Sequence, residues 1–494
     1  MIVHSTQWVS AWPIIVVVVH YVLVLYFVGR VMLRPYREPA SRIAWMLLIL
    51  AVPVFGMVIY VLLGETNVGA KRAQRMHEVR ESLIERFKAS HMADLIPTAI
   101  LDTIPERFHQ VFRIGQSVNG FAPVAGNRAD LTRDSASMID DLVADIDAAT
   151  QHVHLLFYIW LADESGLKVA HALIRAAQRG VVCRVLVDAL GSRALMRSPH
   201  WQEMRTAGVR QEVALSVGNP FLRVLYGRID LRNHRKIMVI DNAITYCGSQ
   251  NCADAAFTPK AKFAPWVDTV VRFTGPIVFQ NQLVFISDWE ATTGERLDLL
   301  DEIDPSIAHE TDGFPAQVIA TGPTERHSAM SDVFMKLIDI AQHELIITTP
   351  YFVPNEAILN ALCVAARCGT QVTLIVPRRN DSWIVAAASR SYYRTLVQAG
   401  VRIFEYNGGL LHAKLLTIDG EVTLIGSANM DRRSFELNYE NNIALYDRTL
   451  TQSIIARQNE YIAASTPVTL DDIDQWRKPK LLWYNTVATM GPVL

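Results

Sequence analysis

One pattern of residues occurs twice in this chain of 494 residues, and it constrains the fold more than any other feature. Residues 234–251 read H-x-K, four residues, D, six residues, G-S-x-N, and residues 412–429 repeat the same types at the same offsets. A single H-x-K-x4-D would arise by accident at about the few-percent level in a chain of this length. Two copies with identical spacing therefore indicate a duplicated unit.

The segments that precede the two motifs repeat as well. A strand-like segment at 152–160 is followed by a helix-like segment at 166–180, and the same order occurs at 343–352 and 355–369. Strands that alternate with helices are typical of layered α/β domains. The sequence therefore predicts an α/β fold, namely a duplicated α/β sandwich whose two halves are related by a pseudo-twofold axis.

Two apolar stretches near the N-terminus, 8–29 and 43–64, carry no formal charge. Each would reach about 33 Å as a helix, enough to cross a bilayer core of about 30 Å. We expect a hairpin of two transmembrane helices joined by an Arg-rich loop. Pro53 lies within the second stretch and could kink it or make it re-entrant.

The side of the membrane on which the rest of the chain lies is left open by the charges. The loop between the stretches holds several arginines, which favours a cytoplasmic loop, whereas basic residues at 71–75 favour the opposite orientation. The expected regions are 1–66 with the two membrane helices, 67–134 as an amphipathic linking region, 135–302 as the first half and 303–494 as the second half. A polar linker at 301–315 would join the halves.

Composition argues against several classes of protein. The formal net charge is −2, so no general basic field would attract nucleic acid. The five cysteines form no CxxC pair and no set spaced with histidines, so we expect free thiols rather than a zinc site or a disulfide framework. The sequence thus predicts no metal and no cofactor.

Strand geometry predicts which motif side chains lie together. His234 and Lys236 are two residues apart, so both project from the same face of a strand, and the same holds for His412 and Lys414. The motif aspartate lies seven residues beyond the histidine, an odd number. We therefore expect it to anchor the strand end rather than to orient the imidazole.

Other residues of the repeated segments are better placed to complete the site. Acidic residues on the following strands are expected to hold the imidazole rings, and the serine and asparagine of each G-S-x-N are expected to face the same cleft and bind substrate. These candidates are Asp268 and Glu440 as supporting acids, and Ser249, Asn251, Ser427 and Asn429 as substrate-binding residues.

These residue types suit chemistry at a phosphodiester. Lysine ammoniums and asparagine amides can neutralise the non-bridging oxygens as charge develops. One neutral imidazole can attack phosphorus to form a phosphohistidine, and a second imidazole, protonated, can donate to the leaving alkoxide. Each half supplies one histidine and one lysine, so one shared site at the junction of the halves explains why both copies are present.

Longer segments carry a family resemblance: "NHRKIMVIDNAITYCGSQN", "FISDWEATTG", "TPYFVP" and "LHAKLLTIDGEVTLIGSANMDRRSFELNYE". They resemble the phospholipase D superfamily and, more closely, the bacterial cardiolipin synthases of the phospholipase D type. The resemblance implies a phosphatidyltransferase that makes cardiolipin and glycerol from two phosphatidylglycerol molecules. It also implies a multi-pass protein of the bacterial inner membrane whose partners are phospholipids and the bilayer, and it leaves a homo-oligomer open.

The resemblance also assigns residues. It implies that His234 is the nucleophile and His412 the acid and base, and it counts both motif aspartates, Asp241 and Asp419, with the catalytic residues. Two alternatives remain. A pocket that admits water would make the protein a hydrolase, either a phospholipase D or a nuclease, and a nuclease should carry a basic groove. A membrane scaffold with a vestigial site would not need intact motifs in both halves.

Overall fold

The computed structural model describes residues 5–65, 68–89, 100–215, 228, 230–298 and 313–489. These residues form two compact units. The N-terminal unit is built chiefly from the residues up to Gly69, and the sheet unit comprises Ala70–Val217 and Leu231–Ala488. Most of the expected linker at 301–315 falls outside the described residues.

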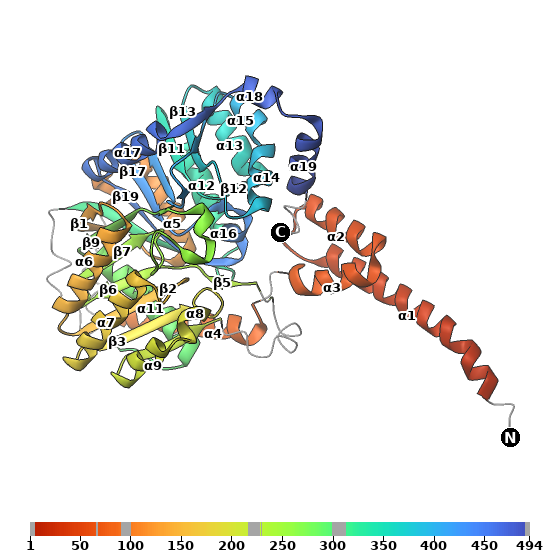
Figure 1. Ribbon diagram of the computed structural model, residues 1–494, viewed down its shortest axis with the longest axis horizontal. Helices are drawn as coiled ribbons and strands as arrows, with labels where there is room; N and C mark the ends of the chain where they lie inside the picture. Colours follow the sequence, from red (N-terminus) through yellow and green to blue (C-terminus); the bar gives the residue numbers. More distant parts are fainter. Residues whose placement is uncertain are drawn as a thin grey trace. The chain divides into compact units, whose positions relative to one another are not determined.

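The N-terminal unit contains the helices α1 (Ser5–Leu33), α2 (Pro39–Ala51) and α3 (Pro53–Leu63) (Figure 1). In α1, the segment Trp12–Leu33 is long and apolar enough to cross a membrane. The second expected span is divided instead, because Pro53 cannot donate a backbone hydrogen bond and Val52 leaves the helical conformation. The hairpin of two continuous membrane helices is therefore not confirmed.

Close packing holds the divided segment together. Gly56 brings α3 so near α2 that an added Cβ would lie 2.6 Å from the carbonyl oxygen of Leu48. Trp45 of α2 and Tyr60 of α3 meet edge to face, with ring centroids 5.2 Å apart. The Arg30 guanidinium of α1 donates to both oxygens of Glu65, at 2.5 and 2.9 Å, and so ties the end of α3 back to α1.

The sheet unit contains one continuous path of strands with an internally repeated order. The first-half strands are β1 (Val124–Leu131), β2 (His152–Phe157), β3 (Val182–Asp188), β4 (Arg210–Ala214), β6 (Ile237–Ile240), β7 (Ile244–Gly248) and β9 (Val270–Thr274). The second-half strands are β10 (Phe314–Thr321), β11 (Glu344–Thr348), β13 (Gln371–Pro377), β14 (Arg402–Tyr406), β16 (Leu415–Ile418), β17 (Val422–Gly426), β19 (Asn438–Tyr446) and β20 (Ser465–Val468).

The strand order is the same in both halves when each is read from its outer edge. It runs β4-β3-β2-β6-β7-β9-β1 in the first half and β14-β13-β11-β16-β17-β19-β10 in the second, with β20 added outside β14. The halves meet where β1 and β10 pair antiparallel, with Val124 opposite Ala316. The predicted duplicated α/β fold is thus confirmed.

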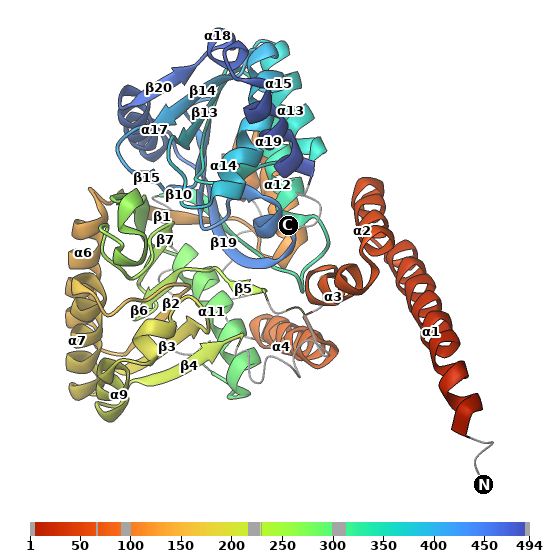
Figure 2. The same cartoon turned by 45° about the vertical axis from the view of Figure 1, so that its right-hand side comes forward.

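Helices cover the sheet on its outer faces. In and before the first half these are α4 (Ala70–Ala89), η1 (Ile100–Thr103), α5 (Glu106–Asn119), α6 (Ser135–Ala148), α7 (Glu164–Gln178), α8 (Arg193–Met196), α9 (Pro199–Thr206), η2 (Thr258–Phe263) and α11 (Ile277–Thr293). In the second half they are α12 (Ala329–Asp339), α13 (Glu356–Arg367), α14 (Trp383–Ser391), α15 (Tyr393–Gln398), α16 (Arg432–Glu436), α17 (Arg448–Ala463), α18 (Leu470–Asp474) and α19 (Lys478–Thr489). Figure 2 shows α6, α7 and α9 along the outside of the first-half strands.

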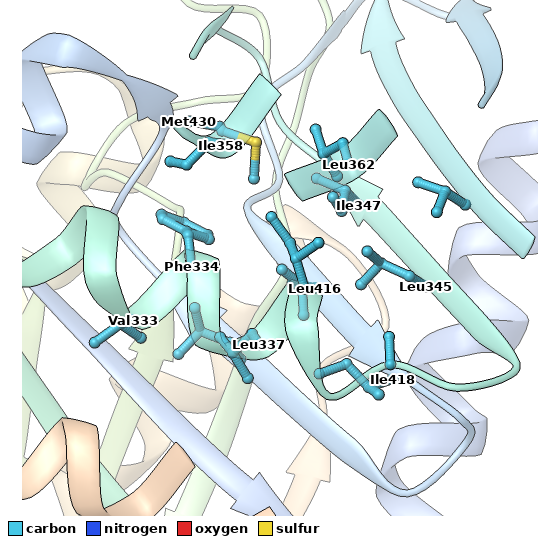
Figure 3. Close-up of a cluster of buried hydrophobic side chains, with 14 of the residues drawn as sticks. Val333, Phe334, Leu337, Leu345, Ile347, Ile358, Leu362, Leu416, Ile418 and Met430 are labelled. Carbon is cyan, nitrogen blue, oxygen red and sulfur yellow. The ribbon is translucent and has the colours of Figure 1, made fainter. Parts of the chain in front are cut away.

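The apolar spacing of each helix matches the strand face that it covers. On α12, Val333 and Phe334 lie one helical turn before Leu337, and the three pack against the alternating apolar side chains of β11 and β16, among them Leu345 and Leu416 (Figure 3). The polar segment that begins near residue 66 forms α4, which packs on α11. There Phe87 stacks on Phe279, and Arg86 donates to both oxygens of Glu290 at 2.9 and 2.8 Å.

Short strands connect the two halves beside the motifs. The strand β5 (Arg232–Asn233) pairs parallel with β19 of the second half, and β15 (Leu410–Leu411) pairs parallel with β8 (Trp266–Val267) of the first half. A further pair, β12 (Phe352–Val353) with β18 (Met430–Asp431), lies within the second half. Each motif histidine follows a strand that is bonded to the opposite half, and this arrangement positions the site.

Candidate active site

The first motif histidine is held by the second half of the sheet. The backbone N–H of His234 donates to the Tyr439 carbonyl at 2.9 Å, which extends the pairing of β5 with β19 by one residue. Its ring Nδ1 lies 2.8 Å from Oε2 of Glu440, the residue next to Tyr439 on β19. The ring is buried and stands 5.0 Å from the ring of Tyr158.

The second motif histidine has the reciprocal arrangement. The backbone N–H of His412 donates to the Val267 carbonyl at 2.7 Å, and its ring Nδ1 lies 2.6 Å from Oδ1 of Asp268. Asp268 and Glu440 thus each hold one ring, as expected, but each carboxylate reaches the ring of the opposite half. This crossing was not expected from the order of the strands.

The carboxylates fix the state of both rings. A carboxylate is only an acceptor, so the Nδ1 that faces it carries the proton and Nε2 keeps its lone pair. Burial lowers the pKa of His234 to about 4, against the opposing effect of Glu440. Burial, aided by Lys414, also lowers the pKa of His412, although Asp268 opposes it. Both imidazoles are therefore neutral at neutral pH.

The two carboxylates stay ionised despite their burial. Burial by itself raises the pKa of Asp268, but His412 and Lys414 more than compensate and bring it to about 2. Burial likewise opposes ionisation of Glu440, and His234 with Lys236 lowers its pKa below the usual value. Each neutral imidazole therefore faces an ionised carboxylate from the opposite half.

Each motif lysine lies beside its histidine, but residues 234–236 and 412–414 connect two strands, whereas the sequence predicted that they are part of one. Lys236 Nζ donates to the His234 carbonyl at 2.8 Å, and Lys414 Nζ donates to the His412 carbonyl at 2.6 Å. Burial lowers the pKa of Lys236 to about 8 and that of Lys414 to about 7, and Lys236 contributes to the shift of Lys414. The two ammoniums are thus close enough to repel, which leaves them ready for an anionic ligand.

The motif serines hold the carboxylates. Ser249 Oγ donates to Asp268 Oδ1 at 2.6 Å, and Ser427 Oγ donates to Glu440 Oε2 at 2.5 Å. These bonds join each serine to a carboxylate of its own half, and the carboxylate in turn faces the ring of the other half. Both serines therefore position the carboxylates, and their contact with substrate stays a prediction.

The motif asparagines differ from each other. Asn251 Oδ1 accepts from the backbone N–H of Ile159 at 3.2 Å, which joins the motif to the end of β2. Asn429 Nδ2 lies 3.3 Å from Ser434 Oγ, while its Oδ1 is buried and has no hydrogen-bond partner among the described residues. An unpaired buried acceptor is costly, so Asn429 Oδ1 is suited to a ligand hydroxyl.

The motif aspartates lie at the far end of the motif strands. Asp241 accepts backbone hydrogen bonds from Gln151 and His152, both at 2.8 Å, where β2 begins. Asp419 accepts from His343 and Glu344 at 2.8 and 2.9 Å, where β11 begins. The expectation of an anchoring role agrees with this geometry, and the inclusion of Asp241 and Asp419 among the catalytic residues does not.

Sequence reasoning missed a buried cation beside the first motif. Arg235, the middle residue of the first H-x-K, donates to Asp288 Oδ1 at 2.8 Å and to the Glu440 carbonyl at 3.2 Å. Asp288 also accepts from Asn233 at 3.0 Å. The second motif has Ala413 at the equivalent position. An additional charged residue between the motif histidine and lysine, directly before the apolar strand β6, was the available signal.

Aromatic rings enclose the second histidine. Trp266 and Tyr351 lie 4.7 and 6.5 Å from the His412 ring, measured between centroids. The Tyr351 hydroxyl donates to Asp381 at 2.7 Å. Within the part of the chain that the structure describes, no group of three or more His, Cys, Asp or Glu is arranged to hold a metal ion.

Comparison with protein families finds the same repeat. A family described as "Cardiolipin synthase, PLD-like domain" matches residues 142–264 and again 334–461. A second family, "Phospholipase_D-nuclease N-terminal", matches residues 22–65. Each copy of the first match contains one motif and the strands that carry it.

Curated relatives match nearly the whole chain. The chain is 36% identical over 464 residues to "Cardiolipin synthase A" of Yersinia pseudotuberculosis serotype O:1b (strain IP 31758), with 93% of both chains covered. It is 35% identical to the protein of the same name from Escherichia fergusonii, with 92% of this chain and 93% of that one covered. Among solved structures, phosphatidylserine synthase of Haemophilus influenzae Rd KW20 shares the fold, with a TM-score of 0.57, 15% identity, and coverage of 78% of this chain and all of that one.

Proposed function

The chain belongs to the cardiolipin synthase family of phospholipase D-like proteins, and from this premise we propose that it is a membrane-bound phosphatidyltransferase. It joins two phosphatidylglycerol molecules into cardiolipin and releases glycerol. The observation that carries this proposal is the pair of buried neutral imidazoles, each held through Nδ1 by a carboxylate of the opposite half. Two buried lysines beside them supply positive charge for a phosphodiester.

In the first step, Nε2 of His234 attacks the phosphorus of one phosphatidylglycerol. An N–P bond forms while the P–O bond to the headgroup glycerol breaks. The bound anionic phosphodiester favours the protonated form of His412, which gives its Nε2 proton to the departing glycerol oxygen. Lys236 and Lys414 stabilise the charge on the non-bridging oxygens in the transition state.

In the second step, a hydroxyl of a second phosphatidylglycerol attacks the phosphatidyl-histidine. The neutral His412 accepts the hydroxyl proton as the new P–O bond forms and the N–P bond to His234 breaks. Cardiolipin leaves, and the proton that His412 accepts in this step replaces the one that it gave to glycerol in the first. Asn429 Oδ1, the buried acceptor without a partner among the described residues, is suited to orient a glycerol hydroxyl.

We assign His234, Lys236, His412 and Lys414 as catalytic residues, with Asp268 and Glu440 holding the rings. The choice of His234 as nucleophile follows the family resemblance, and the denser set of hydrogen bonds on Glu440 supports it. Glu440 Oε1 accepts from Ser434 at 2.8 Å and from Asn438 at 3.1 Å, in addition to the bonds on Oε2. A nucleophile held in one position loses less entropy in the attack.

The proposed domain limits are 1–66 for the membrane region, 67–134 for the linking region, and 135–302 and 303–494 for the two halves. The matched segments 142–264 and 334–461 lie within the proposed halves and support them. We further propose that α1 crosses the bacterial cell membrane and that α2 with α3 forms a second, bent pass. The apolar composition of α1 supports membrane association.

The decisive experiment follows the products from phosphatidylglycerol labelled in its headgroup glycerol. The full-length enzyme should release free glycerol and form cardiolipin in equal amounts. His234→Ala and His412→Ala should each abolish both products, whereas His77→Gln, which changes an exposed side chain paired with Glu81 on α4, should not. Release of phosphatidic acid and glycerol without cardiolipin would identify a hydrolase, and wild-type turnover in His412→Ala would contradict the assignment of the site.

A further inference from the structure

Two tryptophans stand out on the surface of the sheet unit. Trp383, the first residue of α14, is 64% exposed, and Trp483 on α19 is 45% exposed. Their rings stack on each other with centroids 5.5 Å apart. Among the described residues of the sheet unit, every other tryptophan is buried or half-buried. Leu482, next to Trp483 on α19, is 69% exposed, and the three exposed apolar side chains are together called the patch.

Beneath the patch, the helices α14 and α19 pack on each other. Ala387 and Ala388 of α14 pack with Tyr484 and Val487 of α19 in a small buried cluster. The two helices lie side by side in both views of the molecule (Figures 1 and 2). Because the inner face of α19 is used in this way, the exposed side chains of the patch are not needed to hold the helix in place.

Positive charge lies on the same helix as two of the patch residues. The start of α19 carries the exposed residues Lys478 and Lys480, and the segment 477–489 contains no acidic residue. Two of the three acidic side chains of the neighbouring α18 have other contacts, since Asp472 caps its own helix at Thr469 and Asp474 binds Arg394. Tryptophan beside lysine is the composition that binds at the interface of an anionic bilayer.

The patch is connected to the candidate active site through a short loop. Two residues before Trp383, Asp381 accepts hydrogen bonds from the Tyr351 hydroxyl at 2.7 Å and from Lys260 Nζ at 2.5 Å. The ring of Tyr351 lies 6.5 Å from that of His412. Asn380 Nδ2 also donates to the Pro350 carbonyl at 2.7 Å, so the loop before α14 is fixed to the segment that contacts the second histidine.

We propose that Trp383, Leu482 and Trp483, with Lys478 and Lys480, form a docking surface that seats the sheet unit on the anionic membrane interface, on the side of the molecule that is connected to His412 through Asp381 and Tyr351. The surface places the second half against the bilayer that contains the substrate. A phosphatidylglycerol molecule would then reach His412 without passing through bulk water. The part of this inference that concerns the substrate rests on the proposed function, whereas the docking itself does not.

A fluorescent probe on the patch tests docking without relying on activity. The full-length chain carries Cys368→Ser, which removes the exposed cysteine, and Leu482→Cys labelled with an environment-sensitive dye. The matched control is Val182→Cys, which is 40% exposed at the start of β3, whereas the site lies beyond the other end of the parallel strands. The proteins are reconstituted in vesicles of phosphatidylcholine with or without phosphatidylglycerol, some of which carry a nitroxide on the acyl chain near the headgroup.

The expected result is that the nitroxide quenches the dye at 482 and not the dye at 182, and that quenching increases with phosphatidylglycerol. Lys478→Gln and Lys480→Gln should each weaken the docking equilibrium by about fivefold. A dye at 482 that stays as unquenched as the dye at 182 would overturn the proposal. Quenching at 482 that neither anionic lipid nor the lysines influence would also overturn it, because contact with the apolar helices of the chain itself would then explain the signal.

An activity measurement completes the test. Trp383→Ala combined with Trp483→Ala should lower turnover of phosphatidylglycerol in vesicles by about tenfold, which corresponds to the loss of two interfacial aromatic contacts. Turnover of short-chain phosphatidylglycerol dispersed as monomers should remain at the wild-type level. An equal loss with both substrates would overturn the docking role. Absence of cardiolipin from the wild-type enzyme would instead refute the proposed function and leave the probe result standing.

Discussion

The two halves of the sheet unit have the same strand order, yet their histidines lie in different surroundings. Around His234, the carboxylate of Glu440 receives hydrogen bonds on both oxygens, from Ser427 on one and from Ser434 on the other. Around His412, Asp268 receives the ring and Ser249 on a single oxygen. Duplication therefore preserved the backbone while the polar contacts diverged, which allows two chemically identical rings to take different roles.

The two halves also differ in the buried charges that lie near their histidines. The first half has Arg235 beside its histidine, with Asp288 as its partner, whereas the second half has Ala413. The second half has the lysine with the lower pKa, about 7 for Lys414 against about 8 for Lys236. Both lysines thus have a pKa lowered by burial, whereas the surroundings of His234 are the more heavily hydrogen-bonded. This suits a nucleophile in the first half and a proton carrier in the second.

The largest expected effect separates the two histidines by their dependence on the leaving group. His234→Ala and His412→Ala should each lower turnover of phosphatidylglycerol by about 10³-fold or more. A phosphodiester with a nitrophenol leaving group needs no proton donor, so His412→Ala should recover much of the first step on it and His234→Ala should not. Release of nitrophenol in a burst is the measurement. Equal recovery by both variants would remove the distinction between the halves.

Loss of a ring-holding carboxylate should come next in size. Glu440→Gln and Asp268→Asn should each lower kcat by about 10²-fold, because the ring loses the anion that fixes its tautomer. Glu440 raises the pKa of His234, so its removal should move the acid limb of the pH profile of kcat/KM to lower pH. A profile measured from pH 3 to 9 checks both points, and an acid limb that moves upward would contradict the pairing of Glu440 with His234.

Deprotonation of the two motif lysines should cause the fall of kcat/KM at alkaline pH. The ammonium of Lys414, with a pKa of about 7, loses its charge as pH rises through neutrality, and activity should fall with it unless substrate is bound. Lys414→Arg keeps the charge at all these pH values, so this variant should lose the lower alkaline step even if its turnover falls about tenfold. Lys236→Arg is the matched variant, and it should alter the limb near pH 8. The kcat/KM profile of each variant is the readout.

Removal of the buried arginine should affect stability rather than chemistry. Arg235→Ala leaves Asp288 buried without its cation, and should lower the free energy of unfolding by about 3–5 kcal/mol. Urea denaturation of the full-length protein in detergent measures this change. The double variant Arg235→Met with Asp288→Leu, which removes both charges, should restore much of the loss. If it does not, the pair is needed for more than charge balance.

The smallest effect is expected at the serines. Ser427→Ala removes a hydrogen bond to Glu440, and Ser249→Ala removes one to Asp268; each should lower kcat by about fivefold to tenfold. Because Glu440 keeps its contacts with Ser434 and Asn438, the change should be smaller for Ser427→Ala. The ratio of kcat for the two variants tests whether the first histidine is the better supported.

The local features of the site were accessible from the sequence. The period of two in a strand predicts that His234 and Lys236 share a face, and the odd spacing predicts that Asp241 lies at the strand end. Both follow from backbone geometry within a few residues. The crossed pairing of Glu440 with His234 could not be derived in this way, because it depends on β5 lying beside β19, some 200 residues away in the chain.

The features that sequence reasoning missed are those that tertiary packing decides. Arg235, directly before the apolar strand β6, is visible in the sequence as an unusual charge, but its partner Asp288 lies on α11 and only the fold brings them together. The second apolar stretch has the length and composition of a membrane span, yet Pro53 removes one backbone donor and divides it into α2 and α3. Composition predicts that such a stretch avoids water, and it does not predict a continuous helix.

Because each carboxylate contacts the histidine of the opposite half, the two copies of the repeat constrain each other in evolution. A substitution at Asp268 changes the environment of His412, and one at Glu440 changes that of His234. Neither copy of the repeat can therefore change its carboxylate without affecting the histidine of the other copy. Mutations that compensate for each other should accordingly accumulate across the repeat rather than within it. If the two halves were expressed as separate chains, neither would be active alone, and activity would return only when the two chains associate.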